Sequence, residues 1–178
     1  TAEHLNLSAF DFLIQAHQFV EEQGQDPNDI ALYGQDSNGT VWSICNMNMI
    51  LHNNPTALVV QGNTLTDPKF KDGDILKTFH YVVANPPFSD KRWSTGLDPL
   101  NDAYERFKSF GVPPSKQGDY AYLLHIVRTL KSNGKGAVIH PHGVLFRGGA
   151  EAIIRKEVVR HGLIKGIIGL PANLFYGT

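Results

Sequence analysis

The sequence predicts an α/β domain with a doubly wound, mostly parallel sheet. Short runs rich in Val, Ile and Leu recur along the chain without polar alternation, which is typical of strands buried on both faces of a parallel sheet. Segments with helical periodicity separate these runs, and repeated strand–helix–strand connections indicate a layered parallel core. The length of 178 residues and the 42% hydrophobic content suit one domain with a buried core.

The first half of the chain alternates between helical and strand patterns. We expect a helix over residues 8–23, a strand over 30–34, a helix over 38–52 and a strand over 57–60. Ser8 can cap the first helix, and Gly24 can end it. Cys45 is the only cysteine and falls in an apolar part of the second helix. It predicts a small buried side chain and excludes an internal disulfide.

The second half continues this pattern around one long interruption. We expect strands over 81–84, 136–140 and 163–170, and helices over 119–132 and 149–161. Residues 89–116 contain several prolines and glycines, so we expect a long loop there. Its polar residues have no evident partner, which predicts poor order in the absence of a ligand. Open α/β sheets bind ligands beyond the carboxyl ends of their strands, and this loop begins at such an end.

Cations and aromatic residues are interleaved in the loop 89–116. The cations are Lys91, Arg92, Arg106, Lys108 and Lys116, and the aromatic residues are Trp93, Tyr104, Phe107 and Phe110. They could contact a nucleic acid, and a solvated loop with a small satellite core fits them equally well. The formal net charge is only -1, so a nucleic-acid partner would need further basic surface from other subunits.

Other patterns exclude several classes of protein and site. No apolar run reaches the roughly 18 residues of a membrane span, and no signal-peptide pattern begins the sequence. We therefore expect a soluble, cytoplasmic protein without membrane contact. His140 and His142 flank Pro141 at the end of an expected strand, but no cysteine or carboxylate accompanies them in a ligand pattern. This arrangement predicts a turn and no metal site.

The turn that follows the strand run ending at Ala84 reads Asn85-Pro86-Pro87-Phe88 and carries the predicted chemistry. The side-chain oxygen of Asn85 and the carbonyl of Pro86 can both accept hydrogen bonds from one planar NH2 group. Pro86 and Pro87 have fixed φ angles, which makes the turn stiff. Phe88 offers a face on which a flipped base can stack. These residues predict a site that holds an amine for attack on an electrophilic methyl group.

An ordered set of motifs resembles one family. The motifs are Leu32-Tyr33-Gly34-Gln35-Asp36, Gly62-Asn63-Thr64-Leu65, Asn85-Pro86-Pro87-Phe88, Gly134-Lys135-Gly136-Ala137-Val138-Ile139 and Gly169-Leu170-Pro171-Ala172-Asn173-Leu174-Phe175-Tyr176-Gly177-Thr178. Together they resemble the modification subunit of type I restriction-modification systems, from about residue 13 onward. The resemblance implies an S-adenosyl-L-methionine-dependent methyltransferase that modifies the exocyclic amine of adenine in DNA. It also implies a specificity subunit and a restriction subunit as partners.

The resemblance also implies roles for individual residues. Asp36 matches the acid that binds the ribose hydroxyls of the methyl donor. Asn63, followed by Thr64 and Leu65, matches the segment facing the donor's adenine, where an amide oxygen replaces the expected acid and weakens binding. Phe175 resembles a second aromatic wall for the flipped base beside that of the catalytic turn. A phenylalanine packed in the core after a turn explains Phe175 almost equally well.

The chain departs from the family before its first helix. There the family has a strand and a glycine-rich donor loop, whereas residues 5–11 contain no glycine. The resemblance therefore predicts a partial catalytic domain over residues 1–178. This Rossmann-like methyltransferase core lacks its first strand and glycine loop, and we expect it to be inactive or to bind donor weakly or not at all. We expect the strand at 30–34 to pair directly with the strand at 81–84, or the gap to be filled by self-association.

Two alternatives remain open at the level of sequence. The turn at residues 85–88 could hold another planar amine, of an RNA base or of a protein glutamine. The chain could instead be a non-catalytic module that keeps the fold and contacts other subunits. Micromolar binding of S-adenosyl-L-methionine, measured by calorimetry, would exclude the inactive reading.

Overall fold

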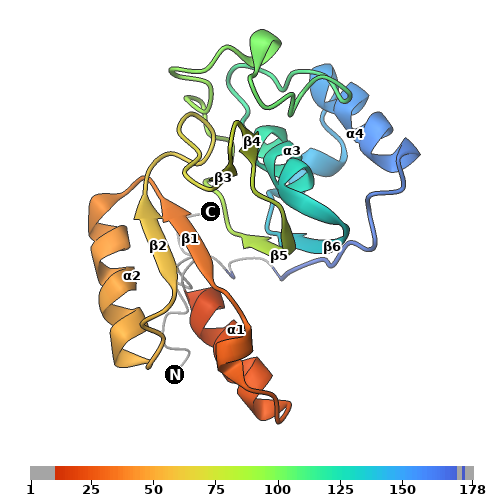
Figure 1. The fold of residues 1–178 in the computed structure, drawn as a ribbon. Coiled ribbons are helices and arrows are strands. Elements are labelled where there is room, and N and C mark those ends of the chain that lie inside the picture. Colours follow the sequence, from red (N-terminus) through yellow and green to blue (C-terminus); the bar gives the residue numbers. More distant parts are fainter. Residues whose placement is uncertain (1–10, 172–173, 175–178) are drawn as a thin grey trace.

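The computed structural model describes residues 11–171 and 174 of the chain. Its two longer strand pairs are both parallel, and each is connected through a helix (Figure 1). The predicted α/β class with mostly parallel strands is therefore confirmed. The strands do not form one sheet, because the described residues contain three separate two-stranded sheets.

The first strand–helix–strand unit packs on the N-terminal helix. It consists of α1 (Asp11–Glu22), the short 3-10 helix η1 (Pro27–Asp29), β1 (Tyr33–Asp36), α2 (Gly39–Leu51) and β2 (Leu58–Gln61). Asn38 caps α2 by accepting hydrogen bonds from the amides of Thr40 and Val41. A small core joins α1, α2 and β2 through Ile14, Cys45, Met49 and Val59. Cys45 is buried as predicted, and burial raises the pKa of its thiol to about 12, with Asp11 and Asp36 adding to the effect.

The second unit follows an antiparallel hairpin. The hairpin strands are β3 (Lys71–Asp72) and β4 (Ile75–Leu76), and the unit comprises β5 (Phe79–Ala84), η2 (Pro99–Asn101), α3 (Asp119–Thr129) and β6 (Leu130–Val138). β5 and β6 pair in parallel with an irregularity between Phe79 and Tyr81, whose partners are Leu130 and Lys135. Gly134 fits inside this irregularity because a Cβ there would lie 2.9 Å from the carbonyl oxygen of Phe79.

The chain continues into η3 (His142–Leu145) and α4 (Ala150–Arg160). The expected turn at 140–142 and the expected helix at 149–161 are thereby confirmed, the helix with slightly shorter bounds. The expected strand at 163–170 is wrong: these residues are exposed and have no regular structure. No other strand in the described part of the chain lies beside them to complete a ladder, and an apolar run alone cannot form one.

The two parallel pairs meet through aromatic rings and not through backbone hydrogen bonds. Tyr33, at the start of β1, packs against Phe79, at the start of β5, with ring centroids 5.3 Å apart, and Phe70 lies 5.2 Å from Tyr33. Direct pairing of these two strands was one of two expected outcomes, and it is not observed, since the described ladders join β1 to β2, β3 to β4 and β5 to β6. Self-association remains a prediction.

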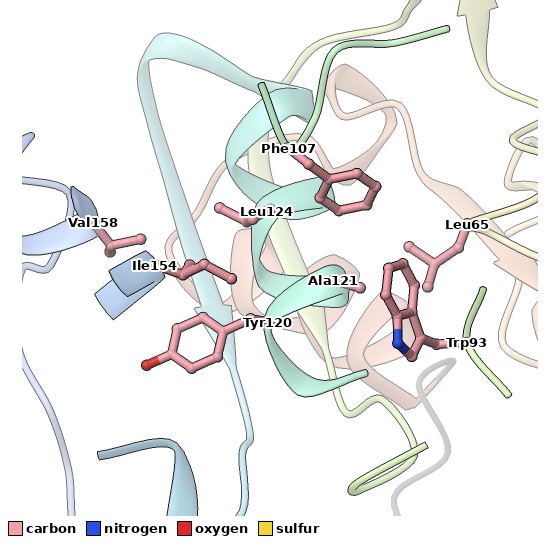
Figure 2. Close-up of a cluster of buried hydrophobic side chains, with 8 residues drawn as sticks. All are labelled: Leu65, Trp93, Phe107, Tyr120, Ala121, Leu124, Ile154 and Val158. Atoms are coloured by element: carbon pink, nitrogen blue, oxygen red, sulfur yellow. The ribbon is translucent and has the colours of Figure 1, made fainter. Parts of the chain in front are cut away.

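The main core surrounds α3 and includes parts of the long loop. Its buried residues are Leu65, Trp93, Phe107, Tyr120, Ala121, Leu124, Ile154 and Val158. Figure 2 shows the α3 side chains between Ile154 and Val158 of α4 on one side and Leu65 and Trp93 on the other. The loop 89–116 therefore contributes Trp93 and Phe107 to the main core, and not to a separate satellite core as the sequence suggested.

A buried ion pair also fixes the long loop. The Arg106 guanidinium donates to both carboxylate oxygens of Asp102, at 2.9 and 2.6 Å, and both side chains are almost fully buried. The expectation that the loop's polar residues lack partners is therefore wrong, and Arg106 is not placed to reach a phosphate. Lys91 and Arg92 are exposed and remain candidates for such contacts. None of the helices in the described residues is long and apolar enough to cross a membrane.

His125 makes the stability of this region depend on pH. Its Nδ1 lies 3.3 Å from Nη1 of Arg106, and burial lowers the His125 pKa to about 3, with the Arg106 charge adding to the effect. Between pH ~6.5 and ~3 the unfolded imidazole binds a proton and the folded one does not, so the free energy of unfolding should fall as the pH falls through this window. Urea titrations at a series of pH values check this. The fall should be smaller in His125→Gln, and an equal fall in both proteins would contradict it.

Candidate active site at the end of β5

The predicted amine-binding turn lies directly after β5. The strand ends at Ala84. The amide of Ile139, which directly follows β6, donates to the Ala84 carbonyl, so the last residue of β5 is still held by a hydrogen bond. Asn85 and Pro86 are half-buried, and Pro87 is exposed. The placement of the turn at a strand's carboxyl end is confirmed. Among the described residues, β5 has a ladder partner on one side only, which is β6.

The residue after the turn has an unusual backbone conformation and a buried partner. Ser89 has φ 51°, in the left-handed region that non-glycine residues rarely adopt. Its amide donates a 2.8 Å hydrogen bond to Oδ1 of Asp119, at the start of α3. Oδ2 of Asp119 accepts a 2.8 Å hydrogen bond from Nη1 of Arg147. The turn is thus anchored at both ends, to Ile139 directly after β6 and to Asp119 at the start of α3.

Asp90 connects the same segment to α3 through several bonds. Its carbonyl accepts from the Gly118 amide, and its carboxylate accepts from the Arg92 amide and from the Tyr122 hydroxyl. A Cβ on Gly118 would lie 2.8 Å from Cβ of Trp93, so only glycine allows this close approach. These contacts seat the chain that leaves the candidate site against the N-terminal turn of α3.

Asp36 ends β1, as the donor-binding hypothesis requires. Its Oδ1 accepts a 2.7 Å hydrogen bond from the Asn38 amide, and its backbone carbonyl accepts from the Gly62 amide. Oδ2 of Asp36 accepts no hydrogen bond from any residue that the structure describes. One carboxylate oxygen is therefore fixed by the cap of α2, and the other is available to a hydroxyl group.

The segment after β2 differs from its expected role. Oδ1 of Asn63 accepts hydrogen bonds from the amides of Leu65 and Thr66, at 2.9 and 3.1 Å. Both lone pairs of this oxygen are thereby used within the loop, and it cannot readily accept from a donor's adenine amine as expected. The Leu65 side chain lies in the main core, so it could contact a donor only through its backbone. Thr64 is half-buried beside them.

Two observations place the ends of β1, β2 and β5 near one another. Leu65, beyond β2, packs with Trp93, beyond β5, in the main core (Figure 2). Asp36, the last residue of β1, pairs with Gln61, the last residue of β2, so the ends of these two strands lie side by side. Burial raises the pKa of the Tyr122 hydroxyl on α3, and the charges of Asp90 and Asp36 add to the effect. Phe175 and residues 5–10 lie outside the described residues.

Sequence reasoning missed three residues near the turn. Asp119 and Arg147 are far from it in sequence, and no local pattern marks them as its partners. His140 was assigned only to a turn, yet both of its ring nitrogens are buried without a hydrogen-bond partner. Burial lowers the His140 pKa, with opposing contributions from Asp119 and Arg147, so the ring favours its neutral form. No three His, Cys, Asp or Glu side chains in the described ranges lie together as metal ligands.

Nearly the whole chain matches one known family. The family model described as N-6 DNA Methylase matches residues 7–178. The chain belongs to the N-6 DNA Methylase family. The predicted resemblance is confirmed, and both the turn at residues 85–88 and the β1–β2 pair fall within the matched residues.

The relatives that match this chain include type I methylase subunits. The chain is 33% identical over 170 residues to the type I restriction enzyme MjaIX methylase subunit of Methanocaldococcus jannaschii, covering 94% of the chain and 29% of the relative. It is 34% identical over 169 residues to the MpnII methylase subunit of Mycoplasma pneumoniae, covering 90% and 31%.

A solved structure also resembles this chain. It is the methyltransferase subunit of a type I restriction-modification system from Streptococcus thermophilus, with a TM-score of 0.83 and 34% identity. The match covers 96% of the chain and 35% of that subunit. The described fold is therefore that of part of such a subunit, and the chain spans about 30% of the length of the curated relatives it matches.

Proposed function

We propose that the chain is part of an S-adenosyl-L-methionine-dependent DNA adenine-N6 methyltransferase of a type I restriction-modification system. The observation that carries this proposal is the turn Asn85-Pro86-Pro87-Phe88 at the carboxyl end of β5. The segment after β5 packs with the segment after β2, and β2 is paired with β1, which ends at Asp36. Family membership supports the reaction class, and the names of the relatives support the type I system.

The turn can hold the target amine from two sides. The Asn85 side-chain oxygen and the Pro86 carbonyl accept the two amine hydrogens, which directs the nitrogen lone pair away from the turn. S-Adenosyl-L-methionine, when bound, supplies a sulfonium methyl group that is electrophilic. The turn would leave the lone pair of the amine nitrogen free to face that methyl group, and the methylated amine would lose one proton to solvent. Phe88 stacks on the flipped base.

Asp36 is the residue that we propose for the donor's ribose, because its Oδ2 has no hydrogen bond within the described residues. We expect Asp36→Asn to weaken donor binding about ten- to a hundredfold, the effect of losing charged hydrogen bonds of ~1.5–3 kcal/mol. The asparagine oxygen can still cap the Asn38 amide. Calorimetric titration with S-adenosyl-L-methionine measures the affinity. Asp72→Asn, on the exposed β3 strand, is the control and should leave the affinity unchanged.

The same titration separates the proposal from its non-catalytic alternative. Micromolar affinity in the unmodified chain supports donor binding by these residues. Absence of binding, with the fold intact by circular dichroism, favours a module that contacts subunits without binding donor. Equal affinities of the unmodified protein and Asp36→Asn would show that Asp36 does not bind the ribose.

The proposal includes DNA, a specificity subunit and a restriction subunit as partners, and a cytoplasmic location. Lys91 and Arg92 are exposed in the segment after the turn and support a contact with phosphates. Methyl transfer to DNA, RNA and glutamine peptides, compared in the complete enzyme with its partner subunits, tests the substrate class. Transfer to RNA or peptide in place of DNA would replace the adenine assignment by one of its two alternatives.

A further inference from the structure

We infer that Asp119 and Arg147 are positioning residues for the catalytic turn, because together they hold the backbone of Ser89 in its left-handed conformation. The inference rests on the proposed function. It concerns residues that lie beyond the turn itself and that no sequence motif connects to it.

The turn has one end that its own residues cannot fix. Ala84 is held by the Ile139 amide, and Pro86 and Pro87 have fixed φ angles. The backbone angles of Ser89, directly after the turn, then help to set the direction in which the chain leaves it. A left-handed backbone at a non-glycine residue costs about 1–2 kcal/mol, so Ser89 keeps this conformation only if its surroundings hold it.

The Asp119 side chain holds Ser89 in this conformation. Its side chain is 1% exposed, and its two carboxylate oxygens have different partners: Oδ1 accepts from the Ser89 amide and Oδ2 accepts from Arg147. A buried carboxylate needs both its charge and its lone pairs satisfied. An amide side chain in its place could accept from one of these donors only, since its other atom is itself a donor.

Arg147 is fixed from the opposite side. Its Nη1 also lies 3.0 Å from Oε1 of Glu151 on α4 and contacts Oε1 of Gln117, and its Nη2 lies 3.5 Å from Oγ of Ser89. Its backbone carbonyl accepts from Arg155. The guanidinium thereby links α3, α4 and the end of the turn. Burial alone would lower the Arg147 pKa, but the hydrogen bond to Asp119 and the charges of Glu151 and Asp119 outweigh it and raise that pKa.

The first test is catalytic and uses the complete enzyme with its partner subunits. Asp119→Asn should lower kcat about ten- to a hundredfold, the loss expected when a reacting group is misplaced by ~1 Å, with little change in KM for DNA or donor. Glycine adopts positive φ without strain, so adding Ser89→Gly to Asp119→Asn should restore part of kcat. Arg147→Gln, which leaves the Asp119–Ser89 bond in place, should cause a smaller loss and replaces Asp119→Asn if that variant does not fold.

Thr129→Val provides the matched control. Thr129 is buried at the opposite end of α3, and its hydroxyl donates only to carbonyls of its own helix. The variant should lower the melting temperature and leave kcat unchanged. If Asp119→Asn likewise lowers only the melting temperature, or if its loss of kcat is not relieved by Ser89→Gly, the positioning role is wrong.

The second test does not depend on methylation. Amide hydrogen exchange at Ser89, followed by NMR on the chain itself, should be slow in the unmodified protein, faster in Asp119→Asn and unchanged in Thr129→Val. If the complete enzyme has no methylation activity, the proposed function fails. The exchange pattern still tests whether Asp119 holds the backbone of Ser89. Unchanged exchange at Ser89 in Asp119→Asn would overturn the inference.

Discussion

Replacing Asn85 by alanine should abolish methylation by the complete enzyme, with a loss of at least about 10²–10³-fold in kcat/KM. The reason is that the target amine loses one of its two acceptors, and the remaining Pro86 carbonyl cannot orient the lone pair alone. Single-turnover methyl transfer to a DNA duplex measures this loss. Affinity for the donor should remain nearly intact, because the missing interaction is made to the amine and not to the donor.

Two measurements make the Asn85 prediction specific. Asn85→Gln keeps the same amide on a longer side chain, so it should retain more activity than alanine but less than the unmodified residue. Asp36→Asn should show the converse behaviour, with weaker donor binding and a smaller loss of rate at saturating donor. If Asn85→Ala reduces donor affinity to the same degree as its rate, the assigned role of Asn85 is wrong.

The elements nearest the catalytic turn could be predicted from sequence because local signals agree there. The apolar run before Asn85 forms the end of β5. The helix expected over residues 38–52 is α2, and Asn38 is its cap. Turn chemistry and caps depend on neighbours in the chain, so a single sequence contains them. The same holds for α4, which begins after Gly149 at φ 65°.

The association of strands could not be predicted in the same way. Residues 163–170 have the apolar content of a buried strand, yet they are exposed because a strand forms only with a partner beside it. The split between β1 and β5 has the same origin: the Tyr33 and Phe79 rings meet where backbone pairing was expected. Composition indicates that a run can be a strand and does not say which neighbour it has.

Side-chain partners far apart in sequence were also beyond prediction. The oxygen of Asn63 matched a donor contact by position, but its geometry directs it to the amides of its own loop. Arg106 was expected among the loop cations that could contact a nucleic acid, but its side chain is buried beside Asp102. The carboxylate of Asp119 reaches Ser89 across 30 positions of sequence, and only the packing of α3 reveals it.

The largest effect on stability should come from breaking the Asp102–Arg106 pair. The Arg106 side chain is 0% exposed, and Asp102 accepts hydrogen bonds from its amide, Nε and Nη2. Burial alone would raise the Asp102 pKa, but these hydrogen bonds outweigh it and hold that pKa below its usual range. Asp102→Asn leaves a buried guanidinium without its counter-charge, and we expect a loss of about 3–5 kcal/mol in the free energy of unfolding, measured by urea denaturation.

An exposed ion pair in the same loop provides the control. Lys108 and Glu105 are also in contact, but both side chains are more than half exposed, so Glu105→Gln should cost no more than about 1 kcal/mol. The double variant Asp102→Leu with Arg106→Met removes both buried charges and should recover much of the stability lost in Asp102→Asn, since well-packed apolar residues can replace a buried pair. Similar losses for Asp102→Asn and Glu105→Gln would show that burial does not set the strength of the Arg106 pair.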